Sequence, residues 1–150
     1  TGLADTALLF ATDSAQTWQG YEQLFAHWQR RPEVVRHVRE RLAIVRALTP
    51  KSDREAGVKR FQRRAYALFA ENLYDAIPPD ADESEANYFH PIETDQAAPH
   101  FPILVDWDER FQEFDPNLRP EQGGATDAQV EATFGALIQW VLLRIGGDAS

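Results

Sequence analysis

The residues of this sequence that are best suited to chemistry lie in one loop. His90 is followed at short spacing by Glu93 and Asp95, and His100 comes soon after them. Imidazole and carboxylate groups are suitable ligands for Zn²⁺ or Fe(II). The spacing matches no standard metal signature, and a loop histidine beside a proline is more often a turn or surface residue. A metal-dependent enzyme that uses these histidines and carboxylates is therefore the last of three functions that the sequence leaves open.

Most other kinds of catalytic group are missing. The sequence has no cysteine, which excludes disulfides, thiolate nucleophiles, thiolate zinc sites and iron–sulfur clusters within it. It also has no glycine-rich phosphate loop, no Gly-x-Ser-x-Gly elbow and no His-Glu-x-x-His motif. Two serines, Ser14 and Ser52, stand where they would cap helices. These features favour a non-catalytic protein without a cofactor.

Charge is distributed unevenly along the chain, whose formal net charge is −9. Basic residues are concentrated between positions 30 and 64, whereas acids dominate the rest. At about 100° per residue, six arginines fall on the outer sides of the helices expected across 32–64. Arginines spaced along a helix can follow a nucleic-acid backbone, which is the second hypothesis. The six are Arg36, Arg39, Arg46, Arg60, Arg63 and Arg64.

The same charge pattern is also compatible with contacts that involve no nucleic acid. The acidic loop that follows could fold back over the basic helices, because opposite charges within about 8 Å of each other attract. Alternatively, a complementary protein partner or a second copy of the chain could meet the basic surface.

Apolar residues recur every three or four positions in four segments that begin near a capping residue or a proline. A fifth segment, over 3–10, fits either a short helix or a buried extended strand. The chain is therefore expected to form one mainly α domain over residues 1–150, a small helical bundle of four to five helices. The four longer segments cover 15–30, 32–48, 54–77 and 126–145.

A long acidic loop rich in proline, 78–125, separates the last two predicted helices. Its expected elements are an extended segment over 101–105 and a short helix over 107–114. Connections this long are uncommon in a compact domain and are usually functional or disordered. The aromatic residues of the loop argue against a disordered linker, and they would pack on the bundle or bind a partner. Those assigned to partner binding are Tyr88, Phe89 and Trp107.

The last predicted helix carries two kinds of apolar residue. Trp140 and Leu143 lie off its main apolar stripe and indicate a second buried face, covered by the loop or by a partner. The main stripe, which is expected to face the core, consists of Val130, Phe134, Leu137, Val141 and Ile145.

These features make protein binding the first hypothesis. The chain would be an interaction module, adaptor, regulator or small subunit of a larger complex, bound to another protein chain or to itself. Its longest uncharged apolar stretch, 132–143, is too short to cross a bilayer, which needs about 20 residues. No secretory signal is visible, so a cytoplasmic protein without a membrane partner is expected.

Overall fold

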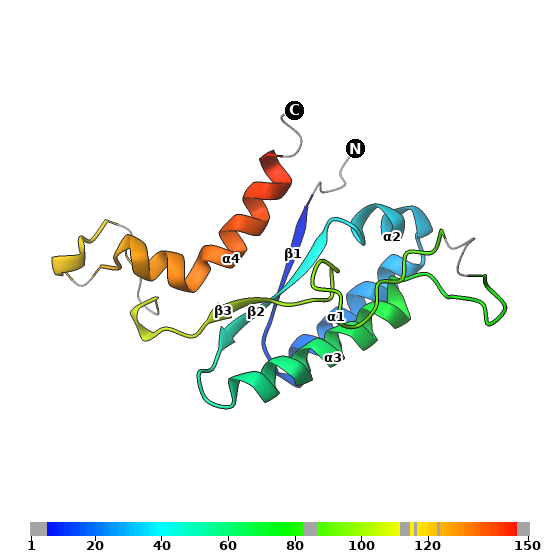
Figure 1. The fold of residues 1–150 in the computed structure, drawn as a ribbon, viewed down its shortest axis with the longest axis horizontal. Helices are drawn as coiled ribbons and strands as arrows, with labels where there is room; N and C mark the ends of the chain where they lie inside the picture. Colours follow the sequence, from blue (N-terminus) through cyan, green and yellow to red (C-terminus); the bar gives the residue numbers. More distant parts are fainter. Residues whose placement is uncertain (1–5, 83–86, 112–114, 116, 123, 147–150) are drawn as a thin grey trace.

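A three-stranded sheet lies between helices in the computed structural model of the chain (Figure 1). The structure describes residues 6–82, 87–111, 115, 117–122 and 124–146. In chain order, the elements are β1 (Ala7–Ala11), α1 (Ala15–Gln29), α2 (Pro32–Val38), β2 (Leu42–Thr49), α3 (Arg54–Asn72), β3 (Ile103–Asp106), the 3-10 turns η2 (Glu109–Phe111) and η3 (Pro120–Gln122), and α4 (Asp127–Gly146).

The strands are all parallel and stand in the order β1-β2-β3. The mainly α helical bundle expected from the sequence is therefore wrong, and the fold is mixed α/β. Parallel strands need long crossover connections, which α1 with α2 supplies between β1 and β2, and α3 with its following loop supplies between β2 and β3.

The largest error concerns the helix predicted over 32–48, which consists of the short α2 and the strand β2. Residues 42 to 46 are all buried, because β2 is the central strand and is covered on both faces. Such a strand has a continuous apolar run, and a continuous run also satisfies helical spacing. The β-branched Ile44 and Val45 were the local signal that favoured a strand.

The two segments for which an extended backbone was considered are strands. The described part of segment 3–10 contributes to β1, in which Leu9 and Ala11 are buried and Phe10 is exposed. Segment 101–105 overlaps β3, as predicted. The helix predicted over 107–114 is described only as η2, and residues 112–114 lie outside the described part of the chain.

Side-chain caps form at the starts of α1 and α4, and the one at Ser14 was predicted. The Ser14 hydroxyl accepts a hydrogen bond from the Thr17 N–H at 3.3 Å and caps α1. At the start of α4 the Gln129 N–H donates to the Thr126 hydroxyl at 3.2 Å, and the Thr126 N–H donates to Gln129 Oε1 at 2.9 Å. This reciprocal pair is a capping box.

The helix cap predicted at Ser52 does not form. Asp53 takes the cap position of α3 with a φ of 50° and makes no capping hydrogen bond with its side chain. The Asp53 carboxylate instead accepts from Arg60 at 3.2 Å, and Glu55 accepts from Lys59 at 2.9 Å.

The helices form two layers around the sheet. α1 and α3 cover one face, and α4 lies over the opposite face (Figure 1). The chain therefore leaves β2 toward one face and its neighbour β3 toward the other. The main core, between the sheet and α1 with α3, contains Leu9, Ala11, Trp18, Phe25, Leu42, Ile44, Phe61, Ala65, Leu68, Phe69, Leu73 and Tyr74.

Candidate functional site

Most of the six arginines assigned to a basic surface are paired with carboxylates of the same chain. Arg64 instead lies over the Trp18 ring, with 5.1 Å between the guanidinium carbon and the ring centroid, and Arg36 is exposed. The pairs are Arg39 with Asp75, Arg46 with Asp13, Arg60 with Asp53 and Arg63 with Glu93, with N–O distances of 2.6, 2.6, 3.2 and 3.9 Å.

Arg46 departs furthest from its expected position, because it lies on β2 rather than on a helix and is only 4% exposed. Its guanidinium lies 5.6 Å from the Phe61 ring centroid and against Gly57, where a Cβ would come within 3.0 Å of Nη2. Nη2 donates to Asp13, whereas the buried Nη1 has no hydrogen-bond partner among the described residues. Arg46 therefore links β2 to the connection between β1 and α1, through Asp13, and to α3, through Gly57 and Phe61.

The two loop histidines are held by hydrogen bonds within the chain. His100 is fully buried, with Nδ1 2.6 Å from the Tyr74 hydroxyl and Nε2 2.9 Å from the Glu93 carbonyl oxygen. Because a carbonyl only accepts, Nε2 donates, and Nδ1 accepts from Tyr74. His90 Nδ1 lies 2.8 Å from the Asp75 carbonyl oxygen. No group of three or more histidines and carboxylates within the described ranges is placed to hold a metal ion.

Burial shifts the ionisation of the Tyr74–His100 pair. Desolvation lowers the pKa of His100 below its usual value, and the hydrogen bond to the Glu93 carbonyl opposes this shift only in part. Burial likewise raises the pKa of Tyr74 well above its usual value. Both groups are therefore neutral at physiological pH, as their shared hydrogen bond requires.

We expect the chain to lose stability as the pH falls below about 6.5, the pKa of an unfolded histidine. Below that pH the histidine of the unfolded chain binds a proton that the buried His100 does not bind, which favours the unfolded state. The contribution of neutral His100 to the free energy of unfolding is therefore complete above about pH 6.5 and is lost as the pH falls toward the lower pKa of the folded state. Urea titrations on either side of that pH should show a smaller acid loss for His100→Gln than for the wild type. His27→Gln, on the exposed side of α1, should behave like the wild type. An equal loss in all three proteins would contradict the assignment.

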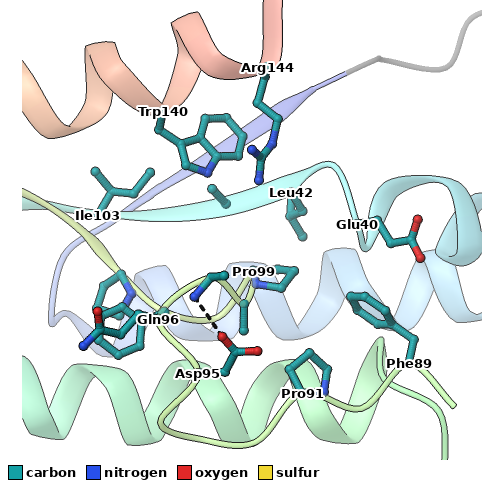
Figure 2. A pocket seen from close by; sticks show the side chains of 15 residues that line it. Glu40, Leu42, Phe89, Pro91, Asp95, Gln96, Pro99, Ile103, Trp140 and Arg144 are labelled. Carbon is teal, nitrogen blue, oxygen red and sulfur yellow. Dashed lines mark hydrogen bonds between the residues drawn. The ribbon is translucent and has the colours of Figure 1, made fainter. Parts of the chain in front are cut away.

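Trp140 faces a cavity of about 380 Å³ between α4, the start of β2 and the loop (Figure 2). The Arg144 guanidinium stands 4.4 Å from the centroid of the Trp140 ring. Phe89 and Pro99 line the cavity from the loop. Trp140 is thus half-buried on the sheet side of α4, whereas the sequence placed it on a face away from the core.

The outer side of α4 presents large apolar side chains to solvent. Ile138, Leu142 and Leu143 are 41%, 61% and 65% exposed. No charged residue occurs between Glu131 and Arg144. Sequence reasoning selected Leu143 and missed the other two, although a helix that is apolar on all sides is itself a signal of a second contact.

The chain matches no protein-family model, curated protein or solved structure with which it was compared. Over the described residues, no helix combines the length and the hydropathy that crossing a bilayer requires.

The residues assigned to a partner surface are distributed over several places. Phe89 and Trp140 line the cavity of Figure 2, and Leu143 and Tyr88 are exposed outside it. Phe89 also lies beneath the Arg39 guanidinium, at 4.9 Å from the guanidinium carbon to the ring centroid. Trp107 lines a separate hollow at the carboxyl ends of β2 and β3. The main apolar stripe of α4 is half-buried from residue 130 to 141, and the side chain of Ile145 lies outside the described part.

Proposed function

We propose that this chain is a non-catalytic protein–protein interaction module, an adaptor, regulator or small subunit of a complex, that acts in the cytoplasm. The observation that carries the proposal is the exposure of Ile138, Leu142 and Leu143 on the outer side of α4. Apolar side chains grouped on a surface are typical of sites that bind another chain. The uncharged stretch 132–143 strengthens the proposal, because charged residues are depleted at the centres of protein interfaces.

A second copy of the chain is the partner that best fits α4. The exposed apolar residues of α4 are small in the first half of the helix, at Ala128, Ala132 and Ala136, and large in the second half, at Ile138, Leu142 and Leu143. The first half also exposes two acids, Asp127 and Glu131. If two α4 helices pack antiparallel, the large half of each meets the small half of the other, so the side chains fill the available space. Antiparallel packing also places the opposite ends of the two helix dipoles together.

The charge of the chain distinguishes this proposal from nucleic-acid binding. Two copies with a net charge of −9 repel each other, so added salt should strengthen their association by screening that repulsion. Binding to phosphates should weaken with salt instead. The nucleic-acid alternative has less support, because Arg39, Arg46 and Arg60 already have carboxylate partners within the chain.

We expect Leu142→Asp to abolish self-association without changing the melting temperature at a concentration where the wild type is monomeric, because the side chain is already solvated in the monomer. Sedimentation velocity over a range of concentrations, at low and high salt, measures this. The matched control is Ile92→Asp, since Ile92 is similarly exposed but belongs to the loop before β3 rather than to α4. The Ile92→Asp variant should still form the dimer.

Two results would contradict the proposal. A wild-type chain that stays monomeric at every concentration and salt would remove the second copy as partner. Salt-sensitive binding of duplex DNA that disappears in Arg36→Glu with Arg63→Glu would favour the nucleic-acid alternative.

A further inference from the structure

The carboxyl ends of β2 and β3 border a hollow of about 810 Å³. The two strands are neighbours, but the chain leaves β2 toward α3 on one face and leaves β3 toward α4 on the other (Figure 1). Divergent connections leave a crevice at the strand ends, which is where open parallel sheets bind ligands. The volume is within the range of small-molecule sites. The crevice is lined by Leu48, Pro50, Lys51, Ser52, Trp107, Asp108 and Glu109.

One wall of the crevice is built from an irregularity in β2. The pairing of β2 with β3 shifts register between Arg46 and Thr49, and Leu48 within this bulge has a φ of 55°. The left-handed region costs an ordinary residue about 1 to 2 kcal/mol. The bulge turns the Leu48 side chain outward, where it is 57% exposed against the crevice. Bulges and strained residues of this kind are concentrated beside functional sites.

The opposite wall is held in place by two contacts, one between the ends of β2 and β3 and one between α3 and the end of β3. The Trp107 N–H donates to the Thr49 carbonyl oxygen at 3.0 Å, and Arg54, in the first turn of α3, pairs with Asp106 at the end of β3. The Trp107 side chain is nevertheless 45% exposed. A large aromatic side chain with a fixed backbone and an open surface is suited to stacking on a flat ring.

The polar groups of the lining select the charge of a ligand. Lys51 disfavours a cation, whereas the Glu109 carboxylate disfavours an anion. An uncharged ligand with hydroxyl groups meets neither penalty, because a carboxylate accepts hydrogen bonds from hydroxyls through both of its oxygens. Leu48, Pro50 and Trp107 complete an apolar surface beside these groups.

We propose that the crevice binds an uncharged nucleoside, with the base stacked on Trp107 and the ribose hydroxyls bound to the Glu109 carboxylate. A nucleoside combines the flat apolar ring and the vicinal hydroxyls that the two parts of the lining match. This site lies at the carboxyl ends of the strands and uses no residue of α4, so it is independent of the proposed self-association.

Isothermal titration with adenosine tests the site. Base–aromatic stacking contributes about 1 to 3 kcal/mol, so Trp107→Ala should weaken adenosine binding by about tenfold. Glu109→Gln should weaken it for adenosine more than for 2′-deoxyadenosine, because the deoxy compound already lacks one hydroxyl. Glu121→Gln is the matched control on the exposed turn η3, outside the crevice, and should bind as the wild type does. Thermal melts verify that each variant is folded.

ATP and methyl riboside are the comparison ligands that test whether the crevice prefers an uncharged nucleoside. ATP should bind no more tightly than adenosine, because Lys51 attracts its phosphates while the Glu109 carboxylate repels them. Tighter binding of ATP, equal binding of methyl riboside, or no heat with adenosine at millimolar concentration would each overturn the nucleoside assignment. Leu142→Asp should bind adenosine as the wild type does. A failure of the nucleoside proposal is therefore distinguishable from a failure of the self-association proposal.

Discussion

Replacing Phe61 by alanine is expected to lower the free energy of unfolding by about 3 to 5 kcal/mol. The Phe61 ring is 1% exposed, on the side of α3 that packs on the sheet. It lies 5.0 Å from the Trp18 ring of α1, centroid to centroid, and faces the Arg46 guanidinium of β2. The substitution therefore leaves a cavity where three elements meet, and it also removes a cation–π contact.

Urea denaturation of the variant measures this loss, and Phe10→Ala is the matched control. Phe10 has the same side chain, but it is exposed on β1 and lies outside the main core. Its truncation should change the free energy of unfolding by less than about 1 kcal/mol. Similar losses in the two variants would contradict the packing of α3 on the sheet.

Phe61 and Val45 show how far the sequence predicts the fold. Phe61 belongs to an amphipathic helix, where polar residues on the outer side mark the direction of the core, and α1 and α3 could be predicted in this way. Val45 lies on a strand that is buried on both faces, so its neighbours carry no such contrast. Its partners across the sheet, Phe10 and Ile103, are remote in sequence, and no local pattern reports their pairing.

The candidate sites could not be predicted from the sequence, for related reasons. His90 and His100 have the residue types of metal ligands, but their partners include two backbone carbonyl groups, which no side-chain motif encodes. Trp107 was assigned to partner binding from the sequence. Leu48 was assigned to the end of the helix predicted over 32–48, where the structure has β2 instead. The crevice requires the β2 bulge and the divergence of two connections, and both features follow from tertiary pairing.

The Asp13–Arg46 pair supplies the second large expected effect. Arg46 is buried, and Asp13 is the carboxylate that accepts from its guanidinium. Asp13→Ala leaves this cation inside the protein without compensation. We expect it to lower the free energy of unfolding by about 2 to 3 kcal/mol, which is less than the cost of breaking a fully buried pair, because Asp13 itself is half exposed.

A double variant separates the effect of the buried charge from a simple loss of contacts. If the uncompensated charge causes the loss, Arg46→Met combined with Asp13→Ala should be more stable than Asp13→Ala alone, because an apolar side chain beside Phe61 carries no desolvation cost. The exposed pair of Lys59 with Glu55 is the matched control, and Glu55→Ala should cost less than about 1 kcal/mol. A double variant that is less stable than Asp13→Ala would indicate instead that the Arg46 side chain stabilises the junction of β1, β2 and α3 mainly through its packing.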